Sequence, residues 1–368
     1  MSAYRCGAWW CPTASEMFDT WTATRHIELS AETITSLEGS QGEATSPWLQ
    51  PDFPPHELIV SWNSRTQGGG SLEILVQVRF DNYESRWLSM GLWSADPAVI
   101  RGSCPDKDEG ECRVLTDTVV CKKAFSAFRV RAVLSGAAEI TGMSATWSDP
   151  KATAAKGHPA YEILAVPSAR ITERIIEEVP TYSQMIYPNG GNTWCSPTSL
   201  AMVMEYWNRT DRGCADCVHE ARAGVYDPVY KGHGNWAFNA AWAGECGFVA
   251  RVLRFPDLRA LEPWIDAGIP LVLSVAWNKQ TGPMLSNAPV TKSNGHLNVL
   301  VGFDEHGNAV MNEPASPSNE TVRRTYARQE LEHCWLKASG GACYVVYPKN
   351  QATPPTDSPL GKALIIAS

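Results

Sequence analysis

A cysteine at the start of a predicted helix is the first residue in this sequence that could do chemistry. Residues 189–200 read as a glycine-containing loop that delivers Cys195 to the first turn of a helix, where Pro197 is well tolerated. Apolar residues then recur at helical spacing, namely Leu200, Val203, Met204 and Trp207. Unpaired N–H groups and the positive end of the helix dipole favour the thiolate at such a position. Cys195 is therefore a candidate nucleophile, and the alternative is a buried structural cysteine in a core helix.

A histidine and an acid lie about a hundred residues downstream, on a predicted β-hairpin. Two apolar stretches, residues 293–303 and 309–314, flank a polar turn. His296 opens the first strand, and Asn312 and Glu313 close the second. Because a hairpin brings its two ends side by side, an acceptor at the far end can orient the imidazole. The chain order of cysteine, histidine and acid or amide is that of papain-like cysteine hydrolases.

Longer motifs around these residues resemble the C39-like cysteine peptidases, a branch of the papain-like superfamily. The resemblance covers roughly residues 160–348. It rests on residues 182–184, 194–199, 295–296, 301–303 and 312–315, and continues through 234–236, 238–239, 267–270, 322–324, Trp335 and 339–341. Family members with this layout also carry a β-rich domain upstream. The family's catalytic acid is normally the Asp of an Asn-Asp-Pro triplet, and this chain has Glu313 at that position.

The resemblance also assigns the remaining site residues. Gln184 lies where the family carries its oxyanion glutamine, although it could instead be a surface polar residue. Within the family motifs, we expect substrate contacts from Trp194, Asn235 and Trp236.

Asn312 is the alternative to Glu313 as the group that orients the histidine. Successive side chains of a strand point to opposite faces, so one of these two neighbours can face His296. Papain-like enzymes also use an asparagine in this role. The family register favours Glu313.

The expected reaction is acyl transfer through a thioester, with Cys195 as nucleophile and His296 as general base and acid. Hydrolysis of a peptide or amide bond is the first expectation, and no cofactor is needed. One alternative is an acyltransferase or transpeptidase that passes the acyl group to an amine. A second is a catalytically decayed binding protein, which the change from Asp to Glu suggests and the retention of Cys195, His296 and Gln184 opposes.

Composition bounds the function further. A chain of 368 residues is long enough for two domains, and its net charge of −8 argues against a nucleic-acid partner. No apolar run reaches the length of a membrane span. We expect a monomer acting on a peptide or acyl-amide substrate. No signal-peptide core is present at the N-terminus, which indicates a cytoplasmic protein, or a secreted one if the chain is a trimmed mature form.

Eleven cysteines leave ten beside the candidate nucleophile. Sequence proximity would allow Cys6 to pair with Cys11, and Cys104 with Cys112. A single CxxC pair is weak support for zinc, so we expect no metal at Cys214, Cys217, His219 and His233.

The predicted fold is α+β in two domains. A β-sandwich accessory domain precedes a papain-like domain, in which a helix bearing the cysteine packs on an antiparallel sheet bearing the histidine. The expected boundaries are an N-terminal tail at 1–15, the sandwich at 16–149, a linker at 150–179, the C39-like peptidase domain at 180–348 and a C-terminal tail at 349–368.

Four tryptophans lie within the predicted strands of the sandwich, Trp62, Trp87, Trp93 and Trp147. We expect them to fill its core, and the alternative is that they line a sugar or peptide site. The loop at 279–292, directly before His296, is a candidate substrate-binding or gating segment.

Overall fold

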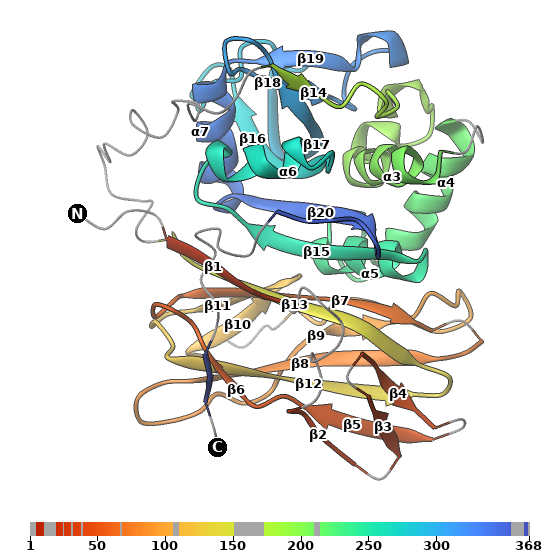
Figure 1. Ribbon diagram of the computed structural model, residues 1–368, viewed down its shortest axis with the longest axis vertical. Coiled ribbons are helices and arrows are strands. Elements are labelled where there is room, and N and C mark those ends of the chain that lie inside the picture. Colours follow the sequence, from red (N-terminus) through yellow and green to blue (C-terminus); the bar gives the residue numbers. More distant parts are fainter. Residues whose placement is uncertain are drawn as a thin grey trace. The chain divides into compact units, whose positions relative to one another are not determined.

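The computed structural model describes residues 5–10, 20–24, 26–30, 32–37, 40–66, 68–105, 110–150, 173–209, 214–354 and 364–366. These residues form two compact units (Figure 1). The β-rich unit takes the described residues within Arg5–Asp149, Tyr226–Val252 and Leu360–Ser368. The α/β unit takes those within Pro150–Val225 and Leu253–Pro359. Among the described residues, no helix is both long and apolar enough to cross a membrane.

Two seven-stranded sheets build the β-rich unit. The first has the order β10 (Cys112–Leu115), β11 (Thr118–Cys121), β7 (Glu57–Arg65), β13 (Glu139–Asp149), β4 (Ile34–Ser36) and β3 (Ile27–Leu29), with β1 (Arg5–Trp10) on β13. The second has the order β2 (Thr22–Ala23), β5 (Gln41–Thr45), β12 (Ala127–Ser135), β6 (Trp48–Gln50) and β21 (Leu364–Ile366), with β8 (Ser71–Arg79) on β12 and β9 (Leu88–Trp93) on β8.

Strand alternation explains how the two sheets share one core. In β8 every second residue is buried, at Leu72, Ile74, Val76 and Val78, because successive side chains point to opposite faces. The same core holds Trp62, Trp93 and Trp147, which are fully buried as expected. Trp87 is partly exposed and lies outside this core.

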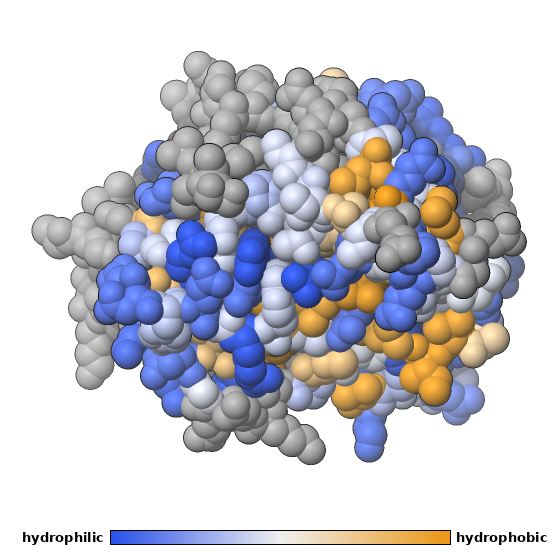
Figure 2. All heavy atoms as spheres, turned by 90° about the horizontal axis from the view of Figure 1, so that it is seen from below, coloured by the Kyte–Doolittle hydropathy of each residue, from blue (hydrophilic) through white to orange (hydrophobic). Residues whose placement is uncertain are grey.

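Cation–π pairs cover the outer side of the second sheet. Arg79 lies 3.9 Å and Arg129 4.5 Å from the ring centre of Trp48, and Arg131 lies 4.3 Å from that of Trp87. Figure 2 views the molecule from the side of this sheet and shows hydrophilic residues gathered over the middle of the face. Trp87 therefore packs under arginine side chains on the outer face of the sheet.

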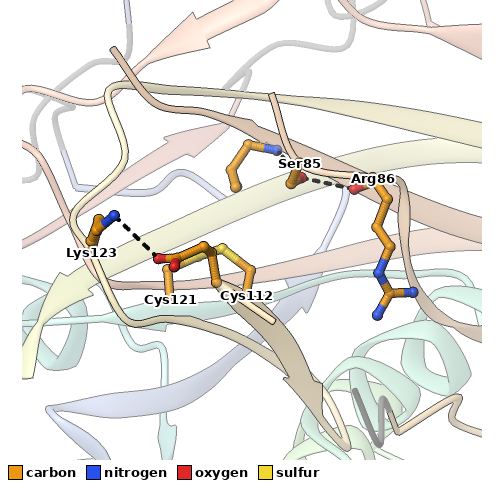
Figure 3. The surroundings of a disulfide bond; sticks show 7 residues. Ser85, Arg86, Cys112, Cys121 and Lys123 are labelled. Atoms are coloured by element: carbon orange, nitrogen blue, oxygen red, sulfur yellow. Dashed lines mark hydrogen bonds and ion pairs between the residues drawn. A yellow bond between two sulfur atoms is a disulfide. The ribbon is translucent and has the colours of Figure 1, made fainter. Parts of the chain in front are cut away.

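A disulfide between Cys112 and Cys121 closes the β10–β11 hairpin (Figure 3). Of the two pairings that sequence proximity would allow, that of Cys104 with Cys112 does not form, because Cys112 lies directly across the hairpin from Cys121 and is bonded to it. Cys11 lies outside the described residues, so the pairing of Cys6 with Cys11 stays untested.

Helix α5 (Trp236–Glu245) belongs to the β-rich unit. Phe238 packs edge-on against Trp93 at 5.0 Å and Trp62 at 6.3 Å between ring centres. The carboxylate of Glu245 accepts hydrogen bonds from Ser64, Thr66 and Trp93. We expected residues 180–348 to form one peptidase domain. Helix α5 lies within that range but belongs to the β-rich unit, because its apolar face completes the core of the sheets.

Both predicted tails contain paired strands. Residues 5–10 form β1, which pairs with β13, and residues 364–366 form β21, which pairs with β6. The expected linker also ends early, because β14 (Arg174–Ile175) pairs with β17 and Ile176 is buried. Residues 151–172 of that linker lie outside the described residues.

A third seven-stranded sheet forms the α/β unit, with the chain passing between units inside β15. Its order is β15 (Phe248–Arg254), β20 (Ala342–Pro348), β16 (Leu271–Asn278), β17 (Lys292–Phe303), β18 (Ala309–Asn312) and β19 (Arg323–Tyr326), with β14 on β17. The helices are η2 (Gln184–Ile186), η3 (Gly191–Thr193), α3 (Cys195–Asn208), α4 (Cys214–Val225), η4 (Leu258–Leu261), α6 (Glu262–Asp266), η5 (Asn319–Thr321) and α7 (Arg328–Ser339).

Helix α3 is attached to the sheet by three side-chain hydrogen bonds. The hydroxyl of Ser199 donates to the carbonyl of Leu297 at 3.0 Å, and Trp207 Nε1 donates to the carbonyl of Val346 at 2.8 Å. The hydroxyls of Ser196 and Tyr344 are 3.0 Å apart. These contacts set the start of α3 beside the residue that precedes Leu297 on β17, which is His296.

Candidate active site

Cys195 is the first residue of α3, and its side chain is partly exposed. The loop before it passes close to the segment that carries Gln184. A Cβ at Gly191 would lie 2.2 Å from the carbonyl oxygen of Gln184, so this approach requires glycine. The sequence around Cys195 thus places the thiol at a helix N-terminus and Gln184 against the same loop.

His296 lies on β17 between the thiol and a carboxylate. Its imidazole is close enough to the Cys195 side chain to lower the pKa of the thiol, and its Nε2 lies 2.5 Å from Oε1 of Glu313. Since Nε2 faces Glu313, Nδ1 is the ring nitrogen left for the sulfur. The backbone N–H of Leu297 also donates to the sulfur of Cys195. The side chains of Cys195, His296 and Glu313 therefore form one continuous chain.

Glu313 rather than Asn312 reaches the histidine. The Asn312 amide donates to the carbonyl of Pro180 at 2.9 Å, and its oxygen accepts from Arg323 Nε at 2.6 Å. Strand alternation turns Asn312 to the opposite face from its neighbour. Its contacts join the segment before η2 to β19, which is a structural role.

Electrostatics favour the charged forms of all three groups. Burial opposes charge on each of them, because a charged group loses solvation. For His296, the charge of Glu313 and the bonds to Cys195 and Glu313 outweigh burial and raise the pKa to about 10. For Cys195, the hydrogen bond to His296, its charge and the Leu297 N–H lower the pKa of the thiol despite burial. The pKa of Glu313 is likewise lowered, chiefly by His296.

Gln184 is held between the cysteine loop and the loop that follows Glu313. Its backbone N–H donates to the carbonyl of Pro314 at 2.8 Å, and the hydroxyl of Ser183 donates to the carbonyl of Ser316. The side chain is 2 % exposed, yet within the described part of the chain its Oε1 makes no hydrogen bond. Oε1 is an acceptor, so this open position suits a donor group, whereas an oxyanion would need the Nε2 donor of the same amide.

Trp194 is buried in an aromatic cluster. Its ring lies 5.4 Å from that of Tyr187 and 5.6 Å from that of His219, and the guanidinium of Arg222 lies 4.9 Å from its centre. The ring therefore supports the cysteine loop from within the unit. Substrate contact by Trp194 stays a prediction.

Asn235 and Trp236 lie in the β-rich unit, at the start of α5. Asn235 is fully buried and caps the helix, since its oxygen accepts from the N–H of Phe238 at 3.1 Å and its amide donates to Asp227 at 2.9 Å. Trp236 is partly exposed, and its backbone N–H donates to Asp117 at 2.6 Å. The capping bonds occupy both polar atoms of Asn235, while contact of either residue with substrate stays untested.

The cysteine and histidines considered as zinc ligands and described by the structure make other contacts or lie in different units. The Cys217 thiol donates to Glu205 at 3.1 Å, His219 packs on Trp194, and His233 belongs to the other unit. The side chain of Cys214 lies outside the described residues. Across the described ranges, no three His, Cys, Asp or Glu side chains gather in a way that could hold a metal ion.

The loop at 279–292 is tied to the rest of the unit at several points. Lys279 Nζ donates to the carbonyl of Ala288 at 2.6 Å, and Trp277 Nε1 donates to that of Val290 at 3.0 Å. The backbone N–H and the hydroxyl of Ser286 both donate to Glu330. The loop is thus held both by a bond within itself and by bonds to its neighbours, and substrate binding or gating by it stays a prediction.

Three residues near His296 were not expected from the sequence. Trp277 stands edge-on to the imidazole, with 5.1 Å between ring centres and 89° between planes. Asn298 and Tyr326 both donate to Glu313. Asn298 could have been found, because it lies two residues after His296 on one strand and shares its face. Tyr326 could not, since its approach depends on the pairing of β18 with β19.

Comparisons with known proteins match two family models to this chain. The Peptidase_C39 like family matches residues 176–343, and the family described as Peptidase C39 N-terminal domain matches residues 12–148. No curated protein matches the chain.

Two solved structures illustrate the similarity. A crystal structure from Bacillus anthracis, described as a C39-like peptidase, is 18 % identical, covers 48 % of this chain and 98 % of its own, and has a TM-score of 0.35. A fragment of prointerpain A from Prevotella intermedia is 15 % identical, covers 51 % of this chain and 74 % of its own, and has a TM-score of 0.28. The family matches carry the conclusion: residues 176–343 of this chain belong to the C39-like peptidases, and residues 12–148 match a C39 peptidase N-terminal domain.

Proposed function

We propose that the protein is a cysteine-dependent hydrolase that cleaves peptide or amide bonds through a thioester. The observation that carries this proposal is the continuous contact from Cys195 through His296 to the buried carboxylate of Glu313. The lowered pKa of the thiol and the raised pKa of the imidazole favour a thiolate–imidazolium pair. A structural cysteine has no need of such a pair.

The first half of the reaction forms the acyl-enzyme. The Cys195 thiolate attacks the carbonyl carbon, a C–S bond forms, and the carbonyl oxygen becomes an oxyanion. The backbone N–H of Cys195 and the side-chain amide of Gln184 are the donors that we assign to this oxyanion. As the C–N bond breaks, the imidazolium of His296 gives its proton to the leaving amine.

The second half regenerates the enzyme. Neutral His296 takes a proton from water as the oxygen attacks the thioester carbonyl. The C–S bond then breaks, and the carboxylic acid leaves while the thiolate and imidazolium are restored. Glu313 accepts the Nε2–H bond throughout, so it orients the ring and stabilises its positive charge.

We also assign the α/β unit to the papain-like architecture. This assignment rests on a cysteine at the start of α3, a histidine on a central strand of an antiparallel sheet, and the bond from Ser199 to Leu297 that joins the two. The β-rich unit is then an accessory domain, and we assign it to the β-sandwiches because two antiparallel sheets share its core.

The test is turnover of a panel of peptides and acyl amides by the wild-type protein and Cys195→Ala, with products identified by mass spectrometry. We expect cleavage by the wild type and none by the variant, because an alanine offers no nucleophile. Turnover by Cys195→Ala at the wild-type rate would overturn the mechanism. Parallel reactions with an added amine distinguish hydrolysis from acyl transfer, since transfer yields a new amide.

A further inference from the structure

The carboxylate of Glu313 receives four hydrogen bonds, two on each oxygen. Oε1 accepts from His296 Nε2 at 2.5 Å and from the backbone N–H of Ala315 at 2.9 Å. Oε2 accepts from the hydroxyl of Tyr326 at 3.0 Å and from Nδ2 of Asn298 at 3.2 Å. The bonds to Oε2 come from the last residue of β19 and from the face of β17 that carries His296.

Tyr326 and Asn298 are both buried, so their polar groups need partners inside the fold. Burial and the negative charge of Glu313 raise the pKa of Tyr326, so its hydroxyl remains a donor at neutral pH. Oδ1 of Asn298 makes no hydrogen bond to the residues that the structure describes. The bond from Nδ2 to Glu313 is therefore the contact that accounts for an amide at this buried position.

We propose that Tyr326 and Asn298 are positioning residues that hold Oε2 of Glu313 so that Oε1 stays on His296. This inference rests on the function proposed for Cys195, His296 and Glu313. A glutamate has one more rotatable bond than the aspartate usual in the family, so its carboxylate needs more restraint to keep one orientation. Two donors on Oε2 supply that restraint, and charge-assisted bonds of this kind are strong and directional.

Length explains why these donors suit glutamate. An aspartate at position 313 has one methylene fewer, so on the same backbone its carboxylate would lie closer to the main chain than the position at which Glu313 meets both His296 and Tyr326. The two donors therefore hold the longer side chain of Glu313 in one conformation. They do so without touching the reacting atoms.

Loss of either donor has a defined effect on the pH dependence. Hydrogen bonds to the ionised carboxylate keep the pKa of Glu313 lowered, so removing one lets that pKa rise. A protonated Glu313 no longer stabilises the imidazolium of His296. The acid limb of thiolate reactivity should therefore move to higher pH in Tyr326→Phe and in Asn298→Leu.

The experiment measures the rate of Cys195 alkylation by iodoacetamide against pH in the full-length protein. This readout needs no substrate. Tyr326→Phe and Asn298→Leu are compared with Tyr206→Phe, which also removes a tyrosine hydroxyl bond, here to the carbonyl of Gly268 at 3.1 Å in the same unit. We expect the acid limb to shift upward by about one pH unit in the first two variants and to stay in place in the control.

Two further readouts separate positioning from simple loss of stability. The His296 Nε2 proton, which we expect far downfield in the proton NMR spectrum of the wild type, should shift or broaden in Tyr326→Phe and not in Tyr206→Phe. On a cleaved substrate, kcat should fall about 10-fold in Tyr326→Phe with little change in KM. In the Glu313→Asp background, Tyr326→Phe should lower kcat little further, because the shorter side chain already lacks the hydrogen bond to the hydroxyl.

Folded Tyr326→Phe and Asn298→Leu proteins with the wild-type pH profile and proton resonance would overturn the inference. Should Tyr326→Phe fail to fold, Asn298→Leu alone decides, since either variant removes one bond to Oε2. A wild-type thiol that reacts only at alkaline pH would overturn the proposed function and this inference with it. A reactive wild-type thiol with unaffected variants would overturn the inference alone.

Discussion

Each unit of the protein contains a buried carboxylate that accepts four hydrogen bonds, and the two carboxylates do different work. In the β-rich unit, Asp227 accepts from the backbone N–H groups of Ser103, Val229 and Tyr230 and from the amide of Asn235. In the α/β unit, Glu313 accepts from Ala315, Asn298, Tyr326 and His296.

The difference lies in what the donors are and where they lead. None of the four donors to Asp227 titrates near neutral pH. The hydrogen bonds to Asp227 therefore fix the conformation of the surrounding loop and lead to no reactive group. One donor to Glu313 is an imidazole, which connects the carboxylate to a thiol. Burial and hydrogen-bond count are therefore poor guides to function, and the connection of a buried carboxylate to a titratable, reactive group is a better one.

The largest expected effect tests this comparison directly. Glu313→Gln should lower kcat by up to about 10⁴-fold, the loss seen when an orienting acid is replaced by its amide in serine proteases. Asp227→Asn makes the matching change in the other unit and should lower the melting temperature without lowering kcat. The measurements are turnover and thermal unfolding of both variants. Equal losses of kcat in the two variants would abolish the distinction.

The second prediction concerns the core of the β-rich unit. Phe238→Ala should lower the free energy of unfolding by about 3–5 kcal/mol, because it removes a buried ring that contacts Trp62 and Trp93. For the same reason, deletion of residues 1–149 should give an unstable, aggregating protein, since α5 would lose the core that buries its apolar face. Denaturant unfolding and light scattering measure the two effects. A soluble, cooperatively folding deletion product would show that α5 can be buried without the sheets.

The third prediction is a pH dependence. Because His296 is charged below a pKa of about 10, thiolate reactivity that depends on the imidazolium should fall as the pH rises through that value. A raised histidine pKa stabilises the fold below the unfolded value, near 6.5, and this contribution is lost as the pH rises through about 10. The lowered pKa of Glu313 acts in the opposite direction and loses its contribution in acid.

The kcat for a cleaved substrate and the melting temperature, each measured against pH, check these limbs. In Glu313→Gln the alkaline limb should move to lower pH, because the charge that raises the histidine pKa is gone. An unmoved limb would mean that Glu313 does not set the charge state of His296.

The smallest expected effect is that of Asn312→Ala. Its side chain joins Pro180 to Arg323 and does not contact His296, so kcat should change by less than about 3-fold, while stability falls by about 1 kcal/mol. Kinetics and thermal unfolding of the purified variant test this. A loss of kcat as large as that of Glu313→Gln would return the orienting role to Asn312.

Local patterns in the sequence were enough to single out Cys195 and His296, two of the three side chains that the structure brings together. Cys195 is marked by a glycine loop and a proline at a helix start, and His296 by the start of an apolar strand. Such signals extend over a few residues, so they can be recognised in the sequence without knowledge of the fold. The same holds for the strands of the β-rich unit, because alternation of buried and exposed residues is local to each strand.

Tertiary contacts decided the remaining features. Alternation allowed one of Asn312 and Glu313 to face His296, and only the family register favoured Glu313. The pairing of β18 with β17 and β19 places Glu313 toward His296. The apolar face of α5 does not reveal which core will bury it. The strands β1 and β21 were not recognised from alternation of apolar and polar residues, and their pairing with β13 and β6 is seen only in the fold. Tyr326 reaches Glu313 from a strand that follows it along the chain, across a register that hydrogen bonds between strands establish. Sequence periodicity shows which side of an element is buried, whereas the partner of that side is chosen by the packing of the whole chain.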